Sequence, residues 1–88
     1  VKVSGKVPII EETNSVACAV QNMHLTANEL GLGCYWGSGG ITYLEEAKPY
    51  FGLEKQDVLM GFLFLGKYDG KQLKSKREPI KKKARWVR

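Results

Sequence analysis

The chain has 88 residues, enough for one domain, and 43% of them are hydrophobic and 26% charged, which is typical of a globular protein. The longest apolar run, in VLMGFLFLG, is too short for a transmembrane helix, and no signal-peptide pattern is visible. We therefore expect a cytoplasmic protein with no membrane partner.

The positive charge is concentrated in the last quarter of the chain. Residues 67–88 contain ten Lys or Arg and two acidic residues, a net charge of +8, whereas residues 1–66 have a net charge of −3. A basic tail commonly contacts phosphate, nucleic acid or an acidic partner. Tyr68 and Trp86 are available to stack on bases, so a small nucleic-acid-binding module is an alternative function. No nucleic-acid-binding motif precedes the tail, which makes this alternative the weaker one.

A long helix is the main predicted element of the first half. Residues 1–7 alternate weakly and predict the end of a strand, with a turn at Pro8. Over residues 11–31, apolar residues recur at steps of three and four, which predicts a helix with a wide, largely buried apolar face. Gly31 is placed to end this helix in the left-handed conformation.

The second half predicts shorter elements. A short strand over residues 33–36 is followed by a glycine-rich loop and by a short helical segment over residues 41–53. The strand over residues 57–66 is apolar on both faces and should be buried centrally. Gly61 inside this strand indicates the close approach of another backbone. A possible last strand covers residues 84–88.

This order of elements predicts an α+β fold that lacks partners for its apolar surfaces. Three strands cannot cover both the long apolar helix and the two-faced strand, so we infer either an obligate oligomer or a missing N-terminal portion. Cys18 and Cys34 are expected to be buried free thiols in a reducing compartment. His24 has no partner at metal-ligand spacing, so no metal site is predicted.

The segment GLGCYWGSGG, residues 31–40, is the strongest candidate for a ligand site. Its spacing is G-x-G-x-x-x-G and it follows a helix, so it is not the dinucleotide fingerprint of a strand–turn–helix unit. No GK[ST] closes a P-loop. Two interpretations stay open. The glycines form only a turn in a structural or interaction domain, or Gly37, Gly39 and Gly40 expose backbone amides to a planar ligand.

Three motifs resemble the nitroreductase family in the same order. SVACAVQNMHLTANELGLGCYWGSGG resembles its long helix and flavin-contacting loop, LEKQDVLMGFLFLGKY a core strand, and KREPIKKKARWVR the tail. The resemblance covers nearly all 88 residues but matches only the C-terminal half of a family subunit. It implies a nitroreductase-like mixed sheet with packed helices, to which residues 1–88 supply the C-terminal portion of a single domain.

The resemblance also implies a function. Family members are FMN-dependent NAD(P)H oxidoreductases that pass a hydride from the nicotinamide to flavin N5 and on to a small organic acceptor. FMN lies at the interface of a homodimer, so Trp36, Gly37, Ser38 and Gly39 in the flavin loop, residues 36–40, would lie against the ring. A backbone N–H of Ser38 or Gly39 would point at N5. No catalytic side chain is implied, because the cofactor performs the difficult step.

The tail acquires a role from the same resemblance. In many relatives an Arg before x-Pro binds the FMN phosphate, and Arg77 is the matching position, with Lys74 and Lys76 as weaker candidates. A guanidinium suits phosphate because it can bind two oxygens at once. Residues 84–88 resemble a terminal strand that family members extend onto the partner subunit.

Overall fold

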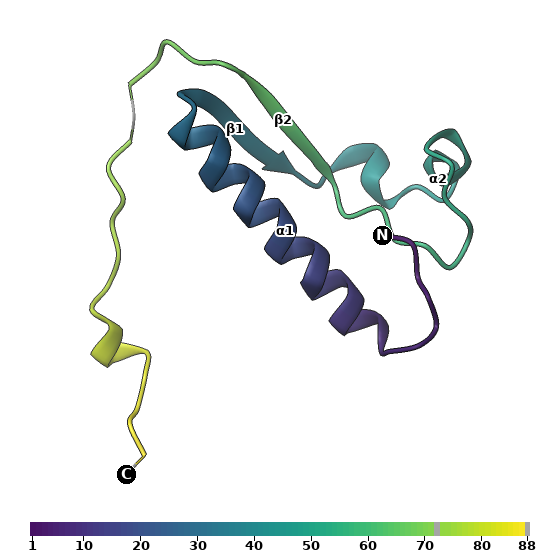
Figure 1. Ribbon diagram of the computed structural model, residues 1–88, viewed down its shortest axis with the longest axis horizontal. Coiled ribbons are helices and arrows are strands. Elements are labelled where there is room, and N and C mark those ends of the chain that lie inside the picture. Colours follow the sequence, from purple (N-terminus) through teal and green to yellow (C-terminus); the bar gives the residue numbers. More distant parts are fainter. Residues whose placement is uncertain (72, 88) are drawn as a thin grey trace.

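The computed structural model describes residues 1–71 and 73–87, and it is a mixed α+β structure, as the sequence predicts (Figure 1). Strands β1 (Leu32–Gly37) and β2 (Phe62–Lys67) pair antiparallel, and helix α1 (Ile9–Glu29) packs against β1. The elements, in chain order, are α1 (Ile9–Glu29), β1 (Leu32–Gly37), the 3₁₀ turn η1 (Gly40–Tyr43), α2 (Ala47–Tyr50), β2 (Phe62–Lys67) and the 3₁₀ turn η2 (Ile80–Lys82).

Helix α1 begins and ends two residues earlier than the predicted range of 11–31. Pro8 precedes the helix, and its carbonyl accepts hydrogen bonds from the amides of Glu11 and Glu12 at 2.9 and 3.3 Å. Because a proline is well tolerated where a helix begins, Pro8 starts this helix rather than separating it from a turn. Gly31 has a φ of +76°, which confirms the predicted left-handed residue at the helix end.

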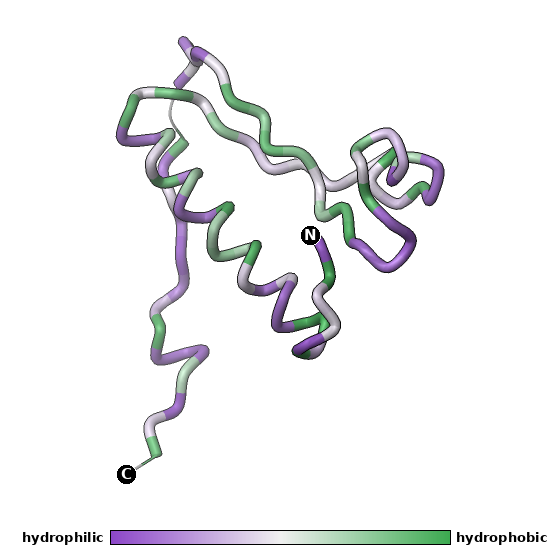
Figure 2. Tube along the Cα trace, turned by 45° about the vertical axis from the view of Figure 1, so that its right-hand side comes forward, coloured by the Kyte–Doolittle hydropathy of each residue, from purple (hydrophilic) through white to green (hydrophobic). Residues whose placement is uncertain are grey.

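The predicted burial of α1 is wrong for the described part of the chain. Ala27 is the one buried apolar residue among residues 1–71 and 73–87, while Met23 is 49% and Leu25 59% exposed. The reason is that the two-stranded sheet covers only one side of the helix. Figure 2 shows apolar segments along α1 and both strands, several of them at the surface.

Strand β2 is shorter and less buried than predicted. It pairs with β1 from Gly37 opposite Phe62 to Leu32 opposite Lys67, so residues 57–61 of the predicted range 57–66 lie before it. Phe64 is 59% exposed, because in the described residues β2 has a strand on one side only. The two apolar faces of β2 are therefore not fully covered by the rest of the described chain.

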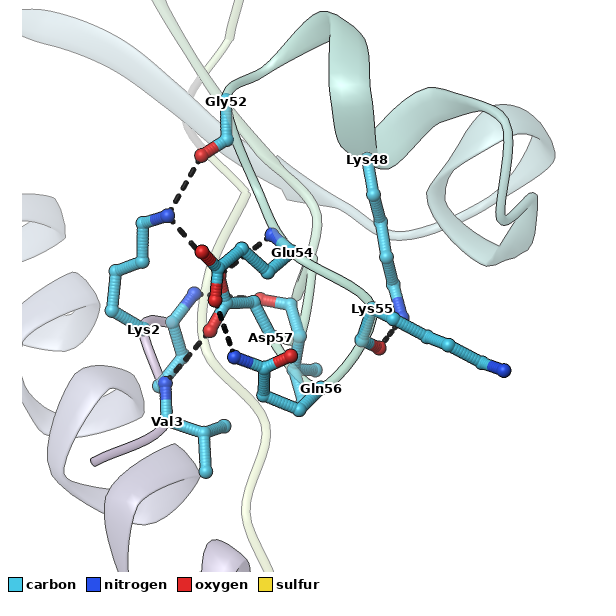
Figure 3. A network of polar contacts seen from close by, with 10 residues as sticks. Lys2, Val3, Lys48, Gly52, Glu54, Lys55, Gln56 and Asp57 are labelled. Carbon is cyan, nitrogen blue, oxygen red and sulfur yellow. Dashed lines mark hydrogen bonds and ion pairs between the residues drawn. The ribbon is translucent and has the colours of Figure 1, made fainter. Parts of the chain in front are cut away.

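The first residues are held against the segment before β2, although they form no strand. The nitrogen and carbonyl of Val1 form two backbone hydrogen bonds with Val58, at 2.6 and 3.0 Å, as in an antiparallel pair. Asp57, 2% exposed, fixes this arrangement (Figure 3). Its carboxylate accepts the amides of Val3 and Glu54 at 2.9 and 2.8 Å and forms an ion pair with Lys2 at 3.2 Å.

The contacts of Asp57 with Lys2, Val3 and Glu54 make the stability of the folded chain depend on pH in the acidic range. Hydrogen bonds from the amides of Glu54 and Val3, with a smaller contribution from Lys2, lower the pKa of Asp57 from 3.8 to about 2, against the opposing effect of burial. The unfolded chain therefore binds more protons than the folded chain between these pH values. The contribution of Asp57 to stability is complete above pH 4 and is lost as pH falls toward 2.

We expect Asp57→Asn to lower the melting temperature at neutral pH by roughly 5 °C. An amide can accept with one oxygen only, so its NH₂ group would face a backbone N–H that is also a donor. Thermal melts between pH 2 and 7 would also show a flatter dependence below pH 4 in the variant. Asp69→Asn removes the same charge from an exposed site and is the matched control. Equal melting temperatures for the two variants would contradict the role of Asp57.

The basic tail is an arm that leaves the end of β2 and runs on the side of α1 away from α2 (Figure 1). Its described residues, 67–71 and 73–87, are all exposed. The predicted strand 84–88 is not formed over residues 84–87. Gln72 and Arg88, which belong to the predicted tail 67–88, lie outside the described residues.

Neither of the two cysteines is buried. Cys18 is exposed and Cys34 half-buried, so the thiols are free but not buried as predicted, because α1 is covered on one side only. Within residues 1–71 and 73–87, no helix combines the length and apolar character needed to cross a membrane.

Candidate functional site

The candidate site lies where β1 ends and η1 begins (Figure 1). Trp36 and Gly37 are the last two residues of β1, Ser38 and Gly39 connect the elements, and Gly40 starts η1. The predicted strand 33–36 is confirmed and is one residue longer at each end, so Trp36 and Gly37 of the predicted loop 36–40 belong to β1. The reason is that Trp36 and Gly37 pair with β2.

Gly39 presents an open backbone surface. It is exposed, and a Cβ added to it would have no other heavy atom within 4 Å. Its φ of −135° and ψ of −177° describe an ordinary extended residue, and its carbonyl accepts the Thr42 amide at 3.1 Å. The side of Gly39 on which other residues carry a side chain is therefore open to a ligand.

Gly37 has a different role, which the sequence did not reveal. A Cβ at this position would lie 2.9 Å from Tyr35 Cε1 and 3.4 Å from Phe64 Cε2. The rings of Tyr35 and Phe64 stack with their centroids 6.2 Å apart and an angle of 26° between their planes. The missing side chain of Gly37 therefore leaves room for this aromatic pair of the same chain.

Trp36 lies against Gly61, just before β2. A Cβ added to Gly61 would lie 2.8 Å from Trp36 Nε1 and 2.5 Å from the carbonyl oxygen of Gly37. The predicted close approach of another backbone to Gly61 is thus confirmed. The Trp36 side chain is held on one side by this contact, and the residue keeps 37% of its surface exposed.

Arg77 lies on the basic arm and is not brought to the candidate site within one chain. Its Nε donates a hydrogen bond to Ser75 Oγ at 3.3 Å, and Lys74 and Lys76 beside it are exposed. The arm starts after Lys67, which pairs with the first residue of β1, whereas the site is at the last residue. Both views show the arm and the η1–α2 region on opposite sides of the molecule (Figures 1 and 2).

Comparison with curated proteins identifies relatives. The chain is 41% identical over 61 residues to the protein named "Putative NAD(P)H nitroreductase YdjA" of Escherichia coli (strain K12), covering 69% of this chain and 33% of that protein. It is 36% identical over 62 residues to "Putative NAD(P)H nitroreductase YfhC" of Bacillus subtilis (strain 168), covering 70% and 32%. This chain is homologous to YdjA and YfhC.

The homology with YdjA and YfhC confirms the resemblance to nitroreductases. The chain spans about a third of the length of these curated relatives. No protein-family model matches it, and no solved structure matches it. The relation to YdjA and YfhC therefore rests on the aligned sequence, and the activity of the whole protein is a matter for proposal.

Proposed function

We propose that the chain is the C-terminal portion of an FMN-dependent NAD(P)H oxidoreductase that reduces a small organic acceptor. One observation carries the proposal. Ser38 and Gly39 are exposed at the end of β1 and a Cβ added to Gly39 would meet no atom within 4 Å, in a chain 41% identical over 61 residues to the protein named "Putative NAD(P)H nitroreductase YdjA". The interpretation of the glycines as a turn fits Gly40, whose φ is +54°, but not Gly37, which lies in β1 and leaves room for Tyr35 and Phe64.

In this proposal the chain binds and orients the cofactor and supplies no catalytic side chain. FMN, when bound, supplies the hydride-transfer chemistry at N5. Trp36 and Gly37 flank the ring, and the amide of Ser38 or Gly39 donates a hydrogen bond to its N5 edge. A backbone donor at a strand end is already fixed in place, so it would orient the N5 edge of the ring without reorganisation.

We also propose that the protein is a homodimer with FMN at the interface, within a nitroreductase-like mixed sheet. The radius of gyration is 16.9 Å, against about 12 Å for a compact chain of this length. Large apolar side chains such as Phe64 and Leu65 are exposed, which favours burial against further protein. The arm leads away from the site of its own chain, so Arg77 would contact the phosphate of an FMN held by the second copy.

The first test is the cofactor content of the purified full-length protein that carries this sequence. We expect a yellow protein whose released cofactor has the mass of FMN and whose flavin absorbance is bleached anaerobically by NADH or NADPH. A folded protein of intact mass that is colourless and binds no added FMN would contradict the proposal.

The exposure of the basic arm keeps nucleic-acid binding as a second candidate. Its described Lys and Arg residues are all exposed and Trp86 is 79% exposed, as stacking on a base would require. Steep salt dependence of RNA or DNA binding by the same preparation would support this function, and salt-insensitive binding would exclude it.

A further inference from the structure

We infer that Gly61 is a positioning residue for the candidate flavin site, because its missing side chain lets the start of β2 fix the Gly37 carbonyl and the Trp36 indole. The inference rests on the proposed function, since it assigns Gly61 a task in cofactor binding. Gly61 itself does not belong to the segment expected to touch the ring.

The contacts around Gly61 are unusually close. The three atoms nearest to an added Cβ are the Gly37 carbonyl oxygen at 2.5 Å, Trp36 Nε1 at 2.8 Å and Trp36 Cδ1 at 3.2 Å. The first two distances are shorter than real Cβ contacts, so any side chain at position 61 would force a movement. All three atoms belong to the segment proposed to hold the flavin.

The backbone conformation of Gly61 adds a second constraint. Its φ of +131° is one that residues with a side chain rarely adopt. Gly66 in β2 offers the contrast, because an added Cβ there would meet no atom within 4 Å and its φ is not in the positive range. Glycine is therefore required at position 61 but not at position 66.

A side chain at position 61 would move the backbone that we propose to bind the ligand. The Trp36 indole can rotate away, but the Gly37 carbonyl is part of the main chain and can move only with its peptide. That peptide leads directly into Ser38 and Gly39. Displacing it would shift the amide that we propose to donate to N5, with no new atom placed against the ring.

The experiment compares Gly61→Ala with Gly66→Ala in the FMN-loaded full-length protein. We expect Gly61→Ala to weaken FMN binding by about tenfold or more, as overpacking of a close contact does, and Gly66→Ala to change it less than about twofold. At saturating FMN, the midpoint potential of the bound flavin should shift in Gly61→Ala alone. A backbone N–H at N5 interacts differently with the oxidised ring, where N5 accepts, and with the reduced ring, where N5 carries a hydrogen, whereas a merely structural role would leave the potential unchanged.

A double variant keeps the inference testable if Gly61→Ala folds poorly. Trp36→Ala removes two of the three close atoms, so G61A/W36A is compared with W36A. We expect the loss of FMN affinity caused by G61A to be smaller in this background but to remain measurable, because the Gly37 carbonyl oxygen, 2.5 Å from the added Cβ, is still present. Equal losses in both backgrounds would overturn the role of the Trp36 indole and assign the effect to the Gly37 carbonyl, and no loss in the W36A background would overturn the role of that carbonyl.

The outcomes separate this inference from the proposed function. A wild-type protein that binds no FMN contradicts the proposed function. A wild-type protein that binds FMN while Gly61→Ala keeps its affinity and potential overturns the role of Gly61 and leaves the proposed function intact.

Discussion

Replacing Gly39 with alanine is expected to weaken FMN binding strongly while leaving the unfolding of the protein unchanged. The added methyl meets no protein atom within 4 Å, and the backbone at Gly39 is ordinary extended chain, so the folded state has nothing to accommodate. A ring lying on this backbone would be displaced. Overpacking of this kind typically costs 1–3 kcal/mol, or roughly 5- to 150-fold in affinity.

The measurement is a titration of the apoprotein with FMN, followed by thermal melts of the apoproteins. Gly66→Ala provides the control for an added methyl, since Gly66 also faces open space but lies at the other end of the sheet. Wild-type FMN affinity in Gly39→Ala would favour the interpretation of these glycines as a turn alone. If Gly39→Ala lowered both the FMN affinity and the melting temperature, the loss of affinity would reflect general destabilisation and not a specific contact with the ring.

Replacing Arg77 with alanine is expected to weaken binding of FMN but not of riboflavin, which lacks the phosphate. Hydrogen bonds to charged groups contribute about 1.5–3 kcal/mol, which corresponds to roughly 10- to 150-fold in affinity. Arg77→Lys should show an intermediate loss, because an ammonium keeps the charge but cannot bind two phosphate oxygens as a planar fork.

Arg85→Ala is the matched control, because it removes the same charge from the same exposed arm. Equal effects of Arg77→Ala and Arg85→Ala would indicate general attraction by the arm, and equal losses for FMN and riboflavin would exclude a phosphate contact.

Mixing Arg77→Ala subunits with Gly39→Ala subunits tests the proposed dimer. If the arm serves the second copy, half of the sites in a mixed dimer regain both elements.

Local patterns predicted the long helix and the strand that follows it well. The apolar period of residues 16–30 located α1 to within two residues at each end, and Gly31 marked its end because a left-handed residue is needed there. The position of Gly61 inside an apolar run predicted a close backbone approach. The helix and its end depend on neighbours in the sequence, whereas Gly61 indicated a close approach without indicating its partners, Trp36 and Gly37.

Contacts between distant residues were not predictable in the same way. Asp57 was treated only as the first residue of a strand, yet it binds the amides of Val3 and Glu54. The polar spacing from Glu54 to Asp57 could have indicated a turn, but nothing near Asp57 pointed to Val3. The burial of α1 and β2 was overestimated for a related reason, since apolar character shows that a surface needs a partner without showing where that partner lies.

The two hydrogen bonds between Val1 and Val58 also affect the order in which the chain folds. It joins residues 57 positions apart, so α1, β1 and the candidate site all lie inside one closed loop. Closing such a loop lowers the conformational entropy of the chain, and this cost is offset only after the contacts between the two ends of the loop have formed. We therefore expect α1 and β1 to associate early and the Asp57 contacts late, so that changes at Asp57 act mainly on the rate of unfolding.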